Sequence, residues 1–331
     1  MRLFRNSCCS SGTILVLLAD RPLLTSEFAD SALFRPADSA IYVYGKRDEA
    51  RTHHIENWSE PARDLEVIEV VENGLDGIEL ASDNDRPISL RDAGELRSIF
   101  EGKTGRPLYV DITGLSNHVW PALLKTALEM RISTNVLYVE PEDYSYSPSP
   151  RENVFFDLSE RIVGISPIPQ FSNLAEPEED ATTLIPLLGF EGARFQYLLE
   201  EIQPRGENID PVIGVPGFRA EYPFFAYQGN QIPLRSSGAY RNVRYAKANC
   251  PFSLYYTLGD IASTYSTRQF FKIGLIGTKP HALGAVLFSL TNPRRVELVY
   301  DHTKRRPQRS SGRSRCLLYP VSAFIERLRG V

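Results

Sequence analysis

The chain has few cysteines and no long apolar run. Its four cysteines are too scattered for a disulfide framework, and no pair has the C-x-x-C spacing of a metal site. The early apolar run from Ile14 to Ala19 leads directly into Asp20 and lacks a small-residue cleavage site, so a buried strand is expected there rather than a signal peptide. No stretch approaches the ~20 apolar residues that span a bilayer. These absences predict a cytoplasmic protein without membrane contact.

Common catalytic signatures are also missing. The chain has no G-x-S-x-G elbow, no Walker lysine motif and no G-x-G-x-x-G after its first predicted strand. Its five histidines show no i, i+4 pairing, so no metal site is predicted. No cofactor is predicted either. Asp111 and Glu140 end neighbouring predicted strands and could face one pocket as general acid and base. We therefore expect a protein that is not an enzyme, with a nucleotide-processing hydrolase or transferase using these two carboxylates as an alternative.

The charges of the chain are divided unevenly along its length. Residues 1–210 contain 19 Lys and Arg against 36 Asp and Glu, whereas residues 211–331 contain 18 against 5. The formal net charge of −4 therefore hides an acidic first part and a basic second part. Such an asymmetry indicates either an anionic ligand on the basic part or a docking face between the two parts.

Both parts alternate short β-branched runs with helical patterns, which is typical of mostly parallel sheets covered by helices. We predict two Rossmann-like α/β units, an acidic one over residues 1–145 and a basic one over 181–331, joined by a proline-rich connector over 146–180. The expected strands are Thr13–Leu18, Ala40–Tyr44, Leu65–Val71, Pro107–Ile112, Thr134–Glu140, Asn153–Asp157, Thr183–Leu188, Pro211–Val215, Phe271–Ile276, Val296–Tyr300 and Arg315–Tyr319. The expected helices are Leu90–Phe100 with Ser89 as N-cap, Asn117–Met130, Glu191–Ile202, Phe252–Tyr265 with Asn249 as N-cap, and His281–Leu290.

One strand–turn–helix–strand pattern occurs twice. The segment from Leu108 to His118 is an apolar strand that ends in Thr113-Gly114, with a His at the start of the following helix. The segment from Phe271 to His281 repeats this order with Gly277-Thr278. In each case the next strand ends in a Tyr near a carboxylate. The two units therefore match in order and in chemistry.

Such turns suit anions, because ligands of open α/β sheets bind outside the carboxyl ends of the strands, where helix N-termini offer free amide hydrogens. A lysine beside the second turn adds a full positive charge, and each His is a pH-tunable donor. The alternative is that any α/β turn favours Gly, Thr and Asn. The predicted ligand contacts at the two turns are Thr113, Gly114, Asn117, His118, Gly277, Thr278, Lys279 and His281.

A basic segment lies between the last two predicted strands. Residues Lys304 to Arg315 include six positive charges, and Arg305, Arg306 and Arg309 are expected to close on the phosphates of a ligand. The segment could instead bind a nucleic-acid backbone, form a solvated hairpin tip, or dock against the acidic part of the chain. It lacks the interleaved aromatic residues expected of a platform for single strands.

The strand ending Val110-Asp-Ile-Thr-Gly114, the helix after it and the strand ending Tyr138-Val-Glu140 resemble a unit of the CRISPR-associated Rossmann-fold (CARF) sensors. Two such units in one chain are similar to the SAVED domains of bacterial anti-phage systems. The resemblance implies binding of cyclic oligonucleotides over the sheet edge, with Thr113, Gly114, Thr278 and Lys279 as ligand contacts. The family usually continues Thr-Gly-Gly-Thr-Lys after the strand, whereas Leu115-Ser-Asn117 follows here.

Together these features predict a nucleotide-binding sensor or regulatory protein, expected in prokaryotic antiviral defence. The ligand would be a nucleotide or another phosphate-bearing small molecule, and an effector protein is a possible partner. A third alternative is a non-catalytic subunit whose basic part grips a partner protein or nucleic acid.

Overall fold

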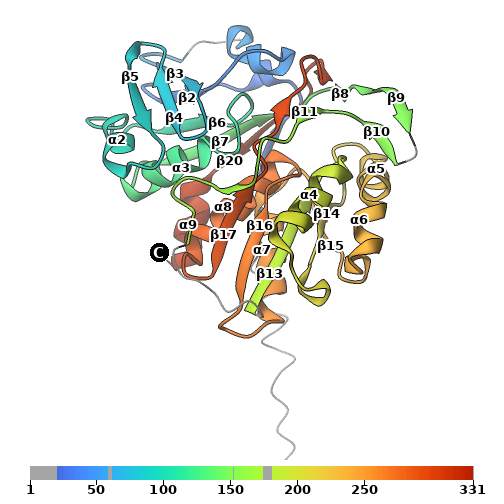
Figure 1. The fold of residues 1–331 in the computed structure, drawn as a ribbon. Helices are drawn as coiled ribbons and strands as arrows, with labels where there is room; N and C mark the ends of the chain where they lie inside the picture. The colour runs from blue at the N-terminus through green and yellow to red at the C-terminus, as the bar shows by residue number, and fades with distance from the viewer. Residues whose placement is uncertain (1–20, 59–61, 152, 174–180, 331) are drawn as a thin grey trace, which may run out of the picture.

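The computed structural model describes all residues except 1–20, 59–61, 152, 174–180 and 331. The strand predicted at Thr13–Leu18 lies outside the described residues. The described chain is mixed α/β and contains two large sheets (Figure 1). Among its helices, none combines the length and the apolar character that crossing a membrane requires.

The first sheet has eight strands, four of which form a parallel block. The block runs in the order β7-β6-β2-β3, and antiparallel strands extend it at both ends. The sheet order is β1 (Ser26–Phe28), β20 (Cys316–Tyr319), β7 (Thr134–Val139), β6 (Leu108–Asp111), β2 (Ile41–Tyr44), β3 (Glu66–Asn73), β4 (Gly77–Leu80) and β5 (Asp83–Ser89). β2 and β6 are buried along their whole length, as expected of strands covered on both faces.

The second sheet has six strands and repeats the order of the first. Its parallel block runs β17-β16-β13-β14-β15, and antiparallel β12 flanks β17 as β20 flanks β7. The strands are β12 (Ser166–Pro167), β17 (Val296–Tyr300), β16 (Phe270–Gly274), β13 (Thr182–Leu188), β14 (Val212–Gly214) and β15 (Arg244–Ala246). In the first sheet the strands that follow β2 in the chain are added on one side of it, and β6 is then added on its other side. In the second sheet the same happens around β13, with β16 added on the other side. Both sheets therefore have a topological switch point beside the central strand.

The C-terminal strand crosses from one sheet to the other. After leaving β17 of the second sheet, the chain places β20 between β1 and β7 of the first sheet, with Leu318 opposite Leu137. The sequence-based boundaries assign this strand to the second unit by chain position, whereas its pairing lies in the first sheet. The two sheets are thus tied by the chain itself as well as by packing.

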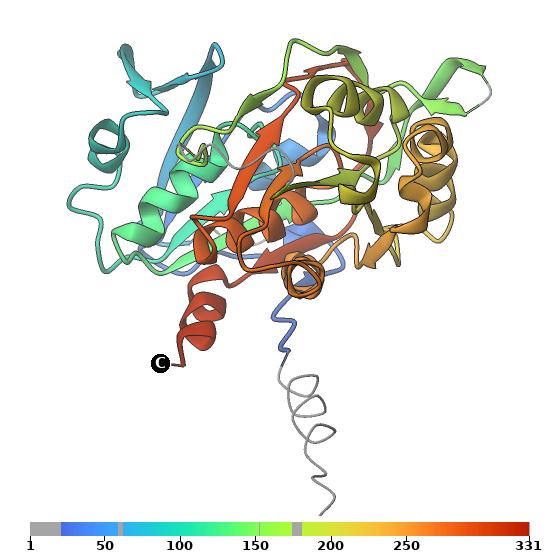
Figure 2. The same cartoon turned by 60° about the horizontal axis from the view of Figure 1, so that its bottom comes forward.

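A helical layer joins the sheets. α8 is buried from Lys279 to Ser289, as expected of a helix that is apolar on every side, and it contacts α3, α7 and β17. One hydrophobic cluster includes Trp120 of α3, Phe252 of α7, Leu287 of α8 and Phe324 of α9, together with residues of both sheets. The views of Figures 1 and 2 place the first sheet on one side of this layer and the second sheet on the other. The helices are α2 (Ala93–Ser98), α3 (Trp120–Glu129), α4 (Gly192–Ile202), α5 (Tyr222–Gly229), α6 (Gln231–Ser236), α7 (Pro251–Ser263), α8 (Lys279–Thr291) and α9 (Val321–Arg329), with 3-10 turns η1 (Ser31–Leu33), η2 (Ala50–Asn57), η4 (Gly206–Asn208) and η5 (Ala239–Arg241).

Two predicted N-caps are wrong. α2 begins after Asp92, whose carboxylate accepts from the amides of Gly94 and Glu95, so Asp92 rather than Ser89 is the cap. α7 begins after Cys250, one residue beyond the predicted Asn249. The carboxylate of Asp92 reaches both free amides directly, which is the usual role of an N-cap.

The connector and the basic segment are paired through small two-stranded ladders rather than long elements. β9 (Tyr146–Arg151) pairs with β10 (Val154–Phe156), β11 (Ser159–Arg161) with β18 (Lys304–Arg305), and β8 (Asp143–Tyr144) with β19 (Ser310–Ser311). The basic segment therefore pairs with earlier strands at two places, through residues 304–305 and through residues 310–311.

Glycines sit where strand ends meet. A Cβ on Gly277 would lie 2.7 Å from the carbonyl oxygen of Leu187, at the end of β13, and a Cβ on Gly114 would strike the carbonyl oxygen of Lys46, just after β2. Neither glycine has a positive φ. Their role is therefore close approach of two backbones at the switch points, not an unusual conformation.

Gly277→Ala tests this role. The added methyl group meets a backbone carbonyl that cannot rotate away, so the free energy of unfolding should fall by about 1–3 kcal/mol. The matched control is Gly259→Ala in α7, where nothing lies within 4 Å of the new Cβ and where stability should be unchanged or rise by up to about 1 kcal/mol. Urea unfolding measures both, and equal stabilities of Gly277→Ala and the unmutated protein would contradict the packing argument.

Candidate functional site

The two repeated turns meet at the contact between the sheets. Lys279, the first residue of α8, directs its amino group at the carbonyl oxygens of Ile112, Thr113 and Leu115, with N···O distances of 2.7 Å to Thr113 and 2.6 Å to Leu115. Three carbonyl acceptors match the three N–H donors of a protonated lysine. Burial, with the charges of Arg305 and Arg51 nearby, lowers the pKa of this amino group. The lysine therefore joins the second turn to the first, and its three N–H donors are all directed at backbone carbonyl oxygens of the protein.

A cavity that we call the basic cavity opens beside this joint. Its volume is about 70 Å³, which is several times the ~10–15 Å³ that a single water needs. The turn residues Gly277 and Thr278 form part of its wall. Five cationic side chains line it, Arg51, Arg194, Lys279, Arg305 and Arg309, and no carboxylate does. The other lining residues are Asn117, Tyr138, Tyr144, Ser159, Gly277, Thr278, Tyr300 and Thr303.

Each sheet contributes one arginine to the basic cavity in the same manner. Arg51, in the segment after β2, lies over the ring of Tyr138 in β7, with 5.6 Å from its guanidinium carbon to the ring centroid. Arg194, in the helix after β13, lies over Tyr300 in β17 at 6.0 Å. The strands that carry these tyrosines occupy matching places in the two sheets. The sequence repeat thus becomes a paired arrangement of two arginine–tyrosine contacts around one cavity.

The carboxylates behind this wall do not neutralise all of its cations. Glu49 accepts from both Arg51 and Arg309, and although burial opposes ionisation, these arginines lower the pKa of Glu49. Asp301 forms a two-point ion pair with Arg194, at 2.6 and 2.7 Å.

Arg305 has no such partner. Among the described residues no carboxylate lies within ion-pair distance of it, and burial together with the charge of Arg309 lowers its pKa. Lys279 also lacks a carboxylate but donates to three carbonyl oxygens, so Arg305 is the arginine of the wall that has no ion-pair partner among the described residues.

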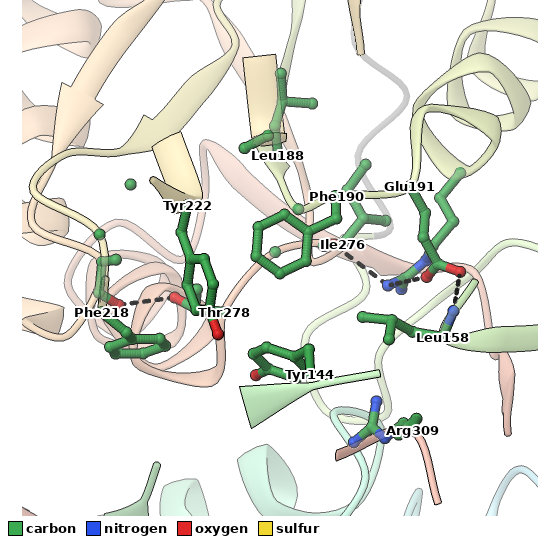
Figure 3. Close-up of a pocket in the computed structure, with 17 residues that line it drawn as sticks. Tyr144, Leu158, Leu188, Phe190, Glu191, Phe218, Tyr222, Ile276, Thr278 and Arg309 are labelled. Carbon is green, nitrogen blue, oxygen red and sulfur yellow. Dashed lines mark hydrogen bonds and ion pairs between the residues drawn. The ribbon is translucent and has the colours of Figure 1, made fainter. Parts of the chain in front are cut away.

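A second, more apolar space adjoins the basic cavity. This aromatic pocket lies at the carboxyl ends of β13, β14 and β16, beside Gly189, Gly214 and Gly277. Figure 3 shows the rings of Phe190, Tyr222 and Tyr144 around it. Thr278 and Arg309 line both spaces, so the two are adjacent at the second switch point. An aromatic wall next to clustered cations is suited to a flat ring attached to a phosphate.

The first switch point has its own opening. A groove, the outer groove, runs over the ends of β2, β3 and β6 and is lined by Lys46, Arg47, Gly114 and Arg305 among others. Glu69 and Glu72 also line it, so its charge is mixed. Arg305 lies in the walls of both the groove and the basic cavity. The three openings therefore follow one another along the contact between the sheets.

Several predicted ligand contacts lie in these walls and others do not. Thr113 is buried and its hydroxyl accepts from the amide of Val139. His281 is buried in α8, where its Nε2 lies 3.1 Å from the carbonyl oxygen of Lys247, and burial lowers its pKa to about 4. His118 is buried just behind Asn117, and Arg306 points outward to Asp157 at 2.8 Å. The predicted contacts that do line the openings are Gly114, Asn117, Gly277, Thr278, Lys279, Arg305 and Arg309.

Most of the basic segment is paired with acidic residues from earlier in the chain. The ion pairs are Lys304 with Glu160, Arg306 with Asp157, Arg309 with Glu49, and Arg315 with Glu27 and Glu140. This matches the docking alternative considered from the sequence. Binding of nucleic acid by the segment stays a prediction.

The two candidate acid–base residues serve in separate contacts. Asp111 accepts from the hydroxyl of Tyr42 and the amide of Thr113, and Glu140 accepts from Arg315. Neither lines the basic cavity, the aromatic pocket or the outer groove. None of these three openings is therefore a pocket that the two carboxylates share.

Sequence reasoning missed Arg51, Arg194 and the rings of Phe190, Phe218 and Tyr222. No local pattern marks the arginines, because each reaches the cavity only after its segment folds back over a distant tyrosine. Their similar placement could have indicated them. Arg194 lies five residues after Gly189 and Arg51 six residues after Gly45, and these glycines follow the two central strands.

Lys279→Met tests the joint between the turns. The substitution leaves three buried carbonyl oxygens without a donor, so the free energy of unfolding should fall by about 2–3 kcal/mol. Lys46→Met is the matched control, because the Lys46 side chain is 74% exposed and should change stability by less than about 0.5 kcal/mol. Thermal or urea unfolding compares the two, and similar small effects would show that the joint is unimportant.

Glu140 provides a test by pH. Burial raises its pKa to about 7 against the opposing effect of Arg315. A folded pKa above the unfolded value gives a contribution that is present at low pH and is lost as the pH rises through 7. Between pH 5 and pH 8, Glu140→Gln should therefore lose less stability than the unmutated protein, by about 2 kcal/mol. Urea unfolding at both pH values measures this difference, and parallel pH profiles would refute it.

Comparison with known proteins adds no family to this picture. No protein-family model and no curated protein matches the chain. The resemblance to the CARF and SAVED sensors therefore remains a prediction from the motifs quoted above, and the case for a ligand depends on the geometry of the three openings.

Proposed function

We propose that this protein is a sensor or regulatory protein that binds a nucleotide, or another small molecule bearing phosphate, between two Rossmann-like units. The phosphate occupies the basic cavity and a base occupies the aromatic pocket. The resemblance in sequence extends the proposal to a role in prokaryotic antiviral defence, with an effector protein as partner.

The observation that carries the proposal is the charge of the basic cavity. Five cations line it, and Glu49 and Asp301 balance only part of their charge. Arg305 is half-buried, and leaving it without a carboxylate beside Arg309 is costly unless an anion occupies the space in the functional state. Arginines also match the geometry of phosphate oxygens.

The place of the cavity in the fold supports the same conclusion. Ligands of open α/β sheets bind outside the carboxyl ends of the strands at a topological switch point. The repeated strand order gives two such points, one beside Gly114 and one beside Gly277, and the three openings lie between and around them. Two Rossmann-like units that share one ligand account for both the repeat and the convergence of the turns.

The surroundings also favour binding over catalysis. The cavity walls present cations, amides and hydroxyls, and a carboxylate suitable as a general base does not line the basic cavity. The described residues contain no group of three or more His, Cys, Asp or Glu that could hold a metal ion.

Calorimetry with inorganic sulfate, mononucleotides, dinucleotides and cyclic oligonucleotides tests the proposal. At least one nucleotide should bind more tightly than about 100 μM, and Arg305→Gln should weaken it at least tenfold, about 1.4 kcal/mol. Arg306→Gln is the matched control, because the neighbouring Arg306 points away from the cavity to Asp157 and its loss should change the affinity less than twofold.

Two outcomes would contradict the proposal. Either no nucleotide in the panel binds more tightly than about millimolar, or Arg305→Gln and Arg306→Gln weaken binding equally, which would indicate loose attraction to surface charge.

A further inference from the structure

Two buried histidines meet at the contact between the units. His118 precedes α3 of the first unit, and His302 follows β17 of the second. Their ring centroids are 5.2 Å apart, and the ring of Tyr300 stacks on His118 with an interplanar angle of 21°. Both histidines are only 6% exposed. We call them the imidazole pair.

The imidazole pair is poorly satisfied in hydrogen bonds. Nδ1 of His302 has no hydrogen-bond partner, and the ring nitrogens of His118 have none apart from the backbone of Gly74, which favours a proton on His118. The Nε2 atom of His302 lies 2.7 Å from the hydroxyl of Ser166. Buried polar atoms without partners are rare in folded proteins because each costs free energy, so each calls for an explanation such as a water, an ion or a proton that arrives during function.

The pair lies directly behind the basic cavity. Its chain neighbours Asn117 and Thr303 line that cavity, as does Tyr300, which contacts both rings. The pair is thus one layer of side chains away from the place proposed for phosphate.

The charged groups around the pair come from four segments. Glu72 of β3 and Asp76 of the turn after it favour a proton on His118, whereas Arg305 of β18 disfavours one. Asp301, which follows β17, and Asp76 favour a proton on His302, although Asp301 is already engaged by Arg194. Burial outweighs these carboxylates, so the pKa of His302 falls to about 4 and that of His118 is also lowered. Both rings are neutral at neutral pH without a ligand.

We propose that the imidazole pair takes up a proton when an anion enters the basic cavity, so that ligand binding and protonation are linked. A negative charge at short range in a poorly solvated space favours the imidazolium form. It also offsets the positive charge of Arg305, which opposes protonation of His118. The added proton gives the pair one further N–H donor.

The affinity for the ligand should depend on pH in one direction. The free protein holds no proton on the pair and the complex holds up to one, so the affinity rises as the pH falls. A full proton corresponds to a tenfold increase in affinity for each pH unit, and half a proton to about threefold. This inference depends on the proposed function, because it requires an anion in the basic cavity.

The test uses ligands whose own charge stays constant between pH 5.5 and pH 8. Inorganic sulfate and the dinucleotide UpU meet this condition, because neither a sulfate ion, a phosphodiester nor uracil titrates in that range. Calorimetry at pH 6 in MES and in bis-Tris, which have different heats of ionisation, gives the number of protons taken up. We expect uptake of about half to one proton for each ligand bound, and affinity that rises about three- to tenfold per pH unit on acidification.

Variants assign the proton. His302→Asn keeps a residue that tolerates the positive φ of 44° at this position, and His118→Asn keeps a polar side chain. Each should bind the ligand at pH 8 within about threefold of the unmutated protein and lose most of the proton uptake. Glu140→Gln is the matched control: its carboxyl group also titrates near pH 7 but lies outside the three openings, so its removal should leave the uptake unchanged.

The outcomes separate this inference from the proposed function. Binding with heats that do not depend on the buffer, or proton uptake that persists in both histidine variants, overturns the inference and leaves the binding site standing. If neither the probes nor any nucleotide binds, the proposed function fails, and the linkage fails with it.

Discussion

The contact of Lys279 with three carbonyl oxygens of the first turn is the interaction on which the site depends. A turn between a strand and a helix leaves backbone carbonyls that need donors, and here the donors come from the opposite unit. The contact fixes how close the two switch points lie. The glycines at 114 and 277 act within each sheet, where they let the turn approach the end of the central strand.

The uneven distribution of charge has two structural meanings. Most of the positive charge between Lys304 and Arg315 is used inside the molecule, where it pairs with Glu27, Glu49, Glu140, Asp157 and Glu160. This internal docking explains why a basic second part follows an acidic first part, and it requires no ligand. Among the described ion pairs, Arg305 and Arg313 are the two cations of this segment without a carboxylate, and Arg305 is the one that lies where the basic cavity and the outer groove meet. A functional argument from charge therefore depends on the residue left unbalanced, not on the total.

Eight of the parallel strands could be predicted from the sequence, whereas β1, β4, β5 and β15 and the assembly of the sheets could not. Runs such as Leu108–Asp111 and Val296–Tyr300 are apolar enough to be strands in any buried sheet, and the Gly-Thr turns could be found by comparing the two halves. The return of Cys316–Tyr319 to the first sheet has no local signal, because an apolar strand can pair in either sheet. α5 and α6 were missed since Pro223, Pro233 and the aromatic residues around them obscure the helical period. Arg51 and Arg194 were missed for a related reason: their function depends on which tyrosine they lie over, and that is decided by tertiary packing.

The sequence of openings constrains the kind of ligand that the proposed site can hold. Thr278 and Arg309 belong to both the aromatic pocket and the basic cavity, whereas Arg305 belongs to both the basic cavity and the outer groove. A ligand that fills more than one opening would therefore carry its negative charge in the middle and its rings toward the ends. Glu69 and Glu72 in the groove disfavour a second phosphate there and favour a sugar or a base with exposed donors. A phosphodiester between two nucleosides meets these conditions better than a nucleoside triphosphate, whose charge is concentrated at one end.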